Sequence, residues 1–171
     1  MKMKGNKLLK IIICICLLFI ICYRLMKNIL LSFDIAFRPW IGDFILIAEF
    51  ILIITVIILL IKKLIFKHSW ANTLKGLLGV ALIIGIIIFT MLIFAFSHQP
   101  EHVVYRNDKK MVAAVDSYMD VYVYYYPYKN WFIMGKEAKM REWYGNGGYD
   151  PFNISNGDKK PVPIKVDYYN K

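Results

Sequence analysis

The spacing of His98, Glu101 and His102 comes nearest to a catalytic motif in this sequence. The segment has the H-x-x-E-H spelling of one class of zinc peptidases, in which two histidines hold the metal and the glutamate is the general base. Pro100 lies inside the motif, and a proline lacks a backbone N–H donor and disfavours a helical conformation at the preceding residue. We therefore favour a structural interpretation, in which this segment ends a membrane helix and opens a strand.

Glu49 is an acidic residue within a long apolar run, and Arg24 is its nearest candidate partner by depth. A carboxylate at that depth is costly, so it must be protonated, paired or in contact with water, and such acids often mark ion or proton routes. One interpretation is an Arg24–Glu49 pair, or a protonated acid, that fixes the packing of two helices. The other is a subunit of an oligomeric ion or solute pathway. Three helices with one buried charge favour the structural interpretation.

Tyrosine is concentrated after residue 97, where 11 of the 12 tyrosines lie. The run SYMDVYVYYYPY from Ser117 alternates as a strand does, so about half of its rings belong to each face. Four aromatic residues within five positions cannot all point into one core. We therefore predict a partner-binding surface formed by Tyr124, Tyr125, Tyr126 and Tyr128. Core packing, cross-strand ladders and an interfacial aromatic belt are the alternatives.

Three apolar runs that could position these residues fill the first 97 positions and predict transmembrane helices at about 8–31, 40–61 and 76–97. The third run has 22 residues without a charge, against the roughly 20 that a helix needs to cross a bilayer. The first run has only 13 uncharged residues, so a cleaved signal peptide is the rival interpretation. Because no small-residue cleavage site follows it, we expect this segment to be kept as a helix.

Basic residues flank the three runs unequally, and this bias predicts the orientation of the helices. Three basic residues lie between the first and second runs, whereas eight lysines precede the first run or lie near the connection from the second to the third. The amino terminus is therefore expected in the cytoplasm and, after three crossings, the C-terminal part outside. Residues 1–97 carry a net charge of +8 and residues 98–171 only +2. The basicity thus indicates topology and attraction to anionic lipid, and does not indicate a nucleic-acid partner.

Residues 98–171 are predicted to form a small antiparallel β domain, because they are rich in aromatic residues and in turn signals. The division from the membrane domain, residues 1–97, is expected at about His98. Four or five strands in a meander would match ordinary sheet sizes. The predicted strands are 101–106, 109–115, a run from Ser117 that Pro127 ends, a pair joined near Gly135, and a short segment at 164–169 after a loop at 153–163.

The three cysteines all lie in the first apolar run, so the C-terminal part has no disulfide, which suits a bacterial envelope. The sequence shows no catalytic triad, nucleotide fingerprint or credible metal cage, and we predict a protein that is not an enzyme and needs no cofactor or metal. The expected function is an integral membrane protein whose extracytoplasmic domain binds a protein, peptide or envelope component, in an accessory, sensing or immunity-type role. Besides the lipid bilayer, a second copy is a conceivable partner, because Ala81 and Gly85 allow close approach of another helix.

Overall fold

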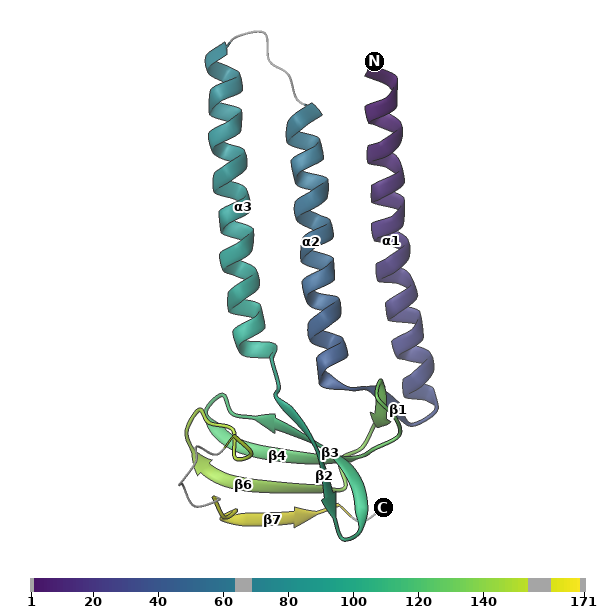
Figure 1. Ribbon diagram of the computed structural model, residues 1–171, viewed down its shortest axis with the longest axis vertical. Helices are drawn as coiled ribbons and strands as arrows, with labels where there is room; N and C mark the ends of the chain where they lie inside the picture. Colours follow the sequence, from purple (N-terminus) through teal and green to yellow (C-terminus); the bar gives the residue numbers. More distant parts are fainter. Residues whose placement is uncertain (1, 64–68, 154–160, 170–171) are drawn as a thin grey trace. The chain divides into compact units, whose positions relative to one another are not determined.

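The computed structural model describes residues 2–63, 69–153 and 161–169, and it contains three long apolar helices followed by a small antiparallel sheet region (Figure 1). The predicted fold class is confirmed. The helices are α1 (Lys2–Ser32), α2 (Pro39–Lys63) and α3 (Ser69–Ser97). By length and composition, each contains a stretch that can cross a membrane: Leu9–Ser32, Pro39–Lys63 and Ser69–Ser97.

The helix α3 begins earlier than its apolar run predicts, at Ser69 instead of residue 76. The extra residues, SWANTLK, contain no proline or glycine, so nothing in them ends a helix. Lys75 therefore lies in the helix itself and not in the connection before it. A long lysine side chain near a helix end can extend its ammonium group toward the interface, so this position still suits a membrane helix.

The chain divides into two compact units, and the division differs from the predicted boundary at His98. The helical unit comprises residues 1–25 and 44–95, and the C-terminal unit comprises residues 26–43 and 96–171. The segment 26–43, which the sequence presents as a plain connection between two helices, thus belongs with the C-terminal unit.

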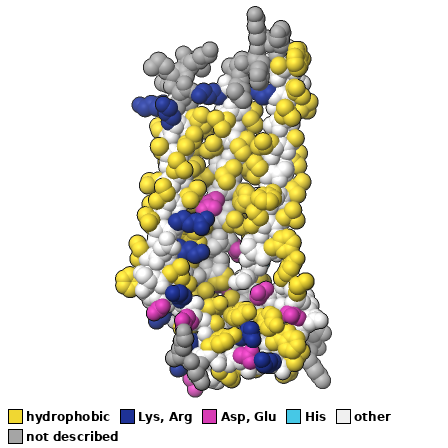
Figure 2. All heavy atoms as spheres, turned by 180° about the vertical axis from the view of Figure 1, so that it is seen from behind, with side chains coloured by type: hydrophobic (Ala, Val, Ile, Leu, Met, Phe, Trp, Pro, Cys, Tyr) yellow, Lys and Arg dark blue, Asp and Glu magenta, His cyan; other side chains and the backbone are white. Residues whose placement is uncertain are grey.

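Within the helical unit, α2 and α3 approach each other at Gly79, the one buried residue among those described in α3. A Cβ atom added at Gly79 would lie 2.8 Å from Cδ1 of Ile61, whereas one at Gly85 would meet nothing within 4 Å. The described part of α2 has no buried residue. Hydrophobic side chains cover most of the visible helix surface in Figure 2, as expected for helices whose solvent is lipid.

The C-terminal unit is built on a five-stranded antiparallel sheet with the strand order β2-β3-β4-β6-β7. Neighbouring strands in the chain are neighbours in the sheet, as predicted for a meander, except that β5 is left out. Successive strand ends therefore alternate between the two ends of the sheet. The strands are β2 (Glu101–Arg106), β3 (Lys109–Asp116), β4 (Asp120–Pro127), β6 (Met140–Asn146) and β7 (Lys165–Tyr168).

A second, two-stranded sheet corrects the predicted pairing around Gly135. β5 (Ile133–Gly135) does not form a hairpin with the segment after it but pairs antiparallel with β1 (Ile35–Phe37), from the segment between α1 and α2. The main-chain N–H of Arg38 also donates to the carbonyl of Phe132 at 3.0 Å. This pairing joins residues about 100 positions apart, so local turn signals could not indicate it. The predicted loop at 153–163 lies mostly outside the described residues.

The hydrophobic core lies on one face of the five-stranded sheet. In β4 the predicted alternation is confirmed, because Val121, Val123 and Tyr125 have no exposed surface while Tyr122 and Tyr124 are half-buried. Direct cross-strand neighbours share a face, so β3 and β6 supply the rest of this layer. Its other buried members are Met111, Ala113, Val115, Met140 and Tyr144.

Candidate functional site

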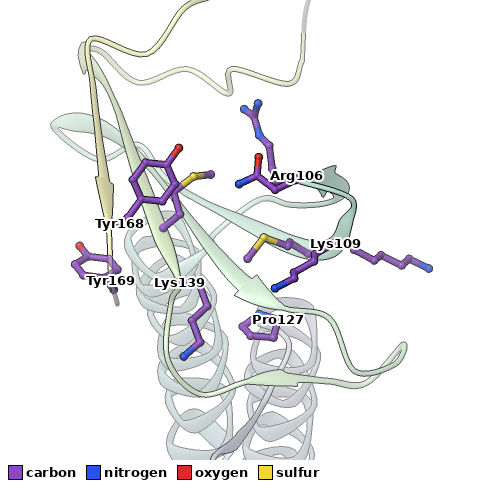
Figure 3. A pocket seen from close by; sticks show the side chains of 10 residues that line it. Arg106, Lys109, Pro127, Lys139, Tyr168 and Tyr169 are labelled. Atoms are coloured by element: carbon purple, nitrogen blue, oxygen red, sulfur yellow. The ribbon is translucent and has the colours of Figure 1, made fainter. Parts of the chain in front are cut away.

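A groove of about 690 Å³ lies at one end of the five-stranded sheet, and we call it the basic groove (Figure 3). The meander brings to this end the last residues of β2, β4 and β7 and the first residues of β3 and β6. Arg106 and Lys109 lie on the side of the β2–β3 turn, and Tyr168 and Tyr169 lie on the side of β7. The lining residues are Arg106, Asn107, Lys109, Lys110, Met111, Pro127, Lys139, Met140, Tyr168 and Tyr169.

Positive charge is concentrated in the basic groove. Four of its ten lining residues are basic, and none of the lining residues that the structure describes is acidic. Residues 98–171 together carry a net charge of only +2, so the groove gathers a local excess of cations from a nearly neutral domain. Lys109, Lys110 and Lys139 are exposed, and the ammonium groups of Lys109 and Lys139 are accessible to a dissolved ligand.

Arg106 is held in place at the groove by a buried carboxylate. Its guanidinium donates through Nη2 to both oxygens of Glu142, at 2.9 and 3.1 Å, and to the hydroxyl of Tyr125 at 3.2 Å. Glu142 is 4% exposed, so its charge is taken out of water and must be matched within the protein. Arg106 is thus fixed and largely neutralised, and Lys109 and Lys139 supply most of the free positive charge of the groove, since the ammonium group of Lys110 lies over the ring of Tyr128.

Two tyrosines complete the shell around Glu142. The hydroxyls of Tyr125 and Tyr144 both donate to this carboxylate, the latter at 2.7 Å. Burial, together with the hydrogen bond to Glu142, raises the pKa of Tyr125 from 10.0 to about 12. The same two causes raise the pKa of Tyr144. Both rings therefore stay neutral donors over the physiological range, and Glu142 has a full set of partners.

The walls of the groove are mainly apolar. Met111 and Met140 come from the core layer, Pro127 ends β4, and the rings of Tyr168 and Tyr169 close the side of β7. A bare inorganic anion would leave these surfaces uncovered. A ligand with negative charges beside apolar or aromatic groups would use both the walls and the lysines. The groove is thus suited to bind such a ligand noncovalently.

The four tyrosines predicted to form one contact surface do not lie together. Tyr125 is fully buried in the core and donates to Glu142, so its assignment to a contact surface was wrong. Strand alternation places Tyr124 and Tyr126 on the opposite face, where they are half-buried. Tyr128 lies beneath two cations, with Lys110 Nζ 4.2 Å and Arg38 Cζ 5.7 Å from its ring centroid. For Tyr124, Tyr126 and Tyr128 a contact role stays a prediction.

The residues of the H-x-x-E-H pattern have three different partners. His98 Nδ1 lies 2.7 Å from Asp43, and His102 Nε2 lies 2.7 Å from Asp150. Glu101 pairs with Arg38 in a buried contact. Within the described part of the chain, no cluster of three or more histidine, cysteine or acidic side chains could hold a metal ion. The pattern thus contributes two histidine–aspartate contacts and one ion pair, Arg38–Glu101, within the C-terminal unit, in agreement with the structural interpretation.

The two intramembrane polar residues are not joined. Glu49 is half-buried in α2 and Arg24 is exposed on α1. The salt bridges among the described residues do not include one between them. The proposed Arg24–Glu49 pair is therefore not formed in this structure, and a role of Glu49 in an ion pathway stays a prediction.

Sequence reasoning missed the basic groove because its parts are far apart in the chain. Arg106, Lys109 and Lys110 surround the Asn107–Asp108 turn, and this basic turn was the one local signal. Lys139 and the Tyr168–Tyr169 pair reach the same place only through the strand order. No protein-family model matches the chain, and no curated protein or solved structure was found to be similar to it. The function must therefore be inferred from this geometry.

Proposed function

We propose that this chain is a cytoplasmic-membrane protein that holds its C-terminal unit outside the cytoplasm and there binds a negatively charged protein, peptide or envelope component in the basic groove. The observation that carries the proposal is the groove itself, with four basic residues, no acidic lining residue among those described, and apolar walls. The accessory, sensing or immunity-type role then consists of recognising such a component at the membrane surface.

The contacts of the segment 26–43 support three crossings. β1 pairs with β5, and Arg38 pairs with Glu101, so the connection between α1 and α2 lies on the same side of the membrane as the C-terminal sheet. Three spanning helices require that arrangement, because the chain must return to that side after α3. The basic residues near the amino end of α1 and at the end of α2 favour the cytoplasm for the other side.

The electrostatics of the groove support a charged ligand that binds mainly through lysines. The lysine ammonium group is a compact point charge that binds carboxylates and phosphates in many orientations. Arg106, the arginine among the described lining residues, is already bound to Glu142. Binding should therefore weaken as salt rises, since exposed charges are screened over about 8 Å at physiological ionic strength.

Binding of a fluorescent acidic peptide to the full chain in nanodiscs of uncharged lipid tests the proposal. The peptide would alternate aspartate and phenylalanine, and its neutral asparagine counterpart is the first control. Replacing Lys109 and Lys139 by glutamine should weaken binding by about 2 kcal/mol in total, or about 30-fold. Replacing Lys129 and Lys165, which do not line the groove, removes the same charge and should change binding less than about threefold. Equal losses in the two double variants would contradict a specific groove.

A further inference from the structure

The turn that joins β3 to β4 has the chemistry that the basic groove is suited to bind. β3 ends at Asp116 and β4 begins at Asp120, with Tyr118 and Met119 between them. Tyr118 and Met119 are 65% and 77% exposed, and one side of the Tyr118 ring contacts Phe96, with the ring centroids 5.0 Å apart. Neither aspartate takes part in a salt bridge among the described residues. We call the segment Asp116–Asp120 the acidic turn.

The acidic turn matches the groove in both charge and polarity. It offers one carboxylate on each side of an aromatic ring and a flexible thioether, with no basic residue in the segment. The groove offers lysines around apolar walls that include two tyrosine rings and two methionines. Methionine adapts to irregular apolar surfaces and makes favourable contacts with aromatic rings, so Met119 is well suited to the wall of Tyr168 and Tyr169.

The turn cannot enter the groove of its own chain. The acidic turn lies where β3 ends and β4 begins, whereas the groove lies where β3 begins and β4 ends. β4 has eight residues, which at the rise of a strand separate the two sites by about 25 Å. The tight register between β3 and β4 holds them at that separation.

We propose that the basic groove of one copy binds the acidic turn of a second copy of this chain. The inference rests on the proposed function, because it names a partner for the same groove. The contact is head-to-tail: the two surfaces differ, so a pair of copies leaves one turn and one groove unoccupied. These bind further copies, and rings or rows result. An external acidic ligand would compete with the neighbouring copy for the groove.

Confinement in a membrane makes such a small contact effective. A turn in a groove buries little area, and in dilute solution the contact would be weak. Copies held in one bilayer have a much higher effective concentration than copies in solution. A weak contact therefore forms more often there, although no interaction is added. The association should therefore be measured on the full chain in membranes.

Directed cross-linking distinguishes a head-to-tail contact from a symmetric one. Cys14, Cys16 and Cys22 are first replaced by serine, and two differently tagged copies are co-expressed. One copy carries Met119→Cys in the acidic turn and the other carries Tyr168→Cys at the groove. We expect a disulfide-linked species that contains both tags, and less than about a fifth as much when both copies carry Met119→Cys or both carry Tyr168→Cys.

Charge reversal supplies the second arm of this experiment. Lys109→Glu with Lys139→Glu in the groove copy should lower cross-linking at least about fivefold, because the carboxylates of the turn then meet like charges. Adding Asp116→Lys with Asp120→Lys to the turn copy should restore it, which also shows that both variants fold. An excess of the acidic peptide should reduce cross-linking in the unreversed pair.

The outcomes separate this inference from the proposed function. If the acidic peptide binds the groove but no mixed species forms, or if the matched-cysteine pairs cross-link equally well, the second copy is not the partner and the groove still binds anions. If the yield of the cross-linked species is unchanged by both charge reversals, the contact does not use the groove and the inference is overturned. If neither the peptide nor the second copy binds, the proposed function fails as well.

Discussion

The helical unit and the C-terminal unit use their apolar residues in opposite ways. In the described helices, α2 has no buried residue and α3 has one, Gly79. In the C-terminal unit, β3 and β4 alone contain six residues with no exposed surface: Val112, Ala113, Val115, Val121, Val123 and Tyr125. Lipid surrounds apolar helices at little cost, so the hydrophobic effect drives burial of apolar side chains only where water is the solvent. The difference places specific chemistry, including every buried ion pair described above, in the C-terminal unit.

The largest expected effect is at Glu142, which the C-terminal unit surrounds with three donors. Glu142→Ala leaves Arg106 and two tyrosine hydroxyls without their acceptor, and breaking such a buried group costs about 3 to 5 kcal/mol. Urea unfolding of the full chain in detergent, followed by tryptophan fluorescence, measures the loss, because Trp40, Trp131 and Trp143 lie in this unit. Lys129→Ala, at an exposed position, is the control and should change stability by less than about 0.5 kcal/mol.

Arg38→Ala tests whether the contacts of the segment 26–43 contribute to the free energy of unfolding of the C-terminal unit. Its guanidinium is 5% exposed and pairs with Glu101, so the substitution leaves a buried carboxylate without its cation. We expect a loss of about 3 kcal/mol in the same unfolding experiment. Nε and Nη1 of Arg38 and Oε2 of Glu101 lack hydrogen-bond partners among the described residues. The double variant Arg38→Met with Glu101→Leu should therefore recover most of the loss, and no recovery would contradict this explanation.

Alkaline pH should destabilise the C-terminal unit selectively. The folded-state pKa of Tyr125 is raised from 10.0 to about 12, so the folded protein keeps a proton that the unfolded chain loses. The stability from this group is complete below pH 10 and is lost as the pH rises toward 12. Tyr125→Phe should cost about 1 to 2 kcal/mol at pH 7, because Glu142 loses one donor, and should make unfolding less dependent on pH above 10. An unchanged slope would contradict the role of Tyr125.

The smallest effect is expected at Glu49 in the helical unit. Glu49→Gln keeps the size of the side chain and removes its charge, and no salt bridge to Arg24 is lost. Peptide binding to the groove and unfolding of the C-terminal unit should change by less than about 0.5 kcal/mol. Ion or proton flux through liposomes that contain the chain is the separate test of the pathway hypothesis. A flux that the substitution abolishes would give the helical unit a chemistry of its own.

Local patterns in the sequence predicted the parts of the fold that depend on neighbouring residues. β2 and β3 were expected because Asn107–Asp108 lies between two β-rich segments, and both residues have positive φ angles, 48° and 60°, as the tightest hairpin turns require. The alternation of side chains along β4, which also depends only on neighbouring residues, predicted its buried face. The three helices followed from apolar length alone.

Pairings between distant residues were beyond such patterns. β1 has only three residues, and nothing in the sequence FDIAFR identifies β5 as its partner. The tyrosine cluster was taken for a surface because crowding was counted along the chain, whereas Glu142 lies on a neighbouring strand and gives Tyr125 a buried partner. The lysines of the groove also meet only after the strand order is known. Sites that depend on contacts between strands thus need the structure.

Protection of a groove cysteine in intact cells tests the central claim most directly. The chain would carry Tyr168→Cys with Cys14, Cys16 and Cys22 replaced by serine, and would be labelled with a membrane-impermeant maleimide with and without the acidic peptide. We predict labelling of intact cells that the peptide slows at low salt, while Val162→Cys, outside the groove, labels equally in both conditions. Labelling only after lysis would place the C-terminal unit in the cytoplasm, and labelling that the peptide does not slow would contradict anion binding in the groove.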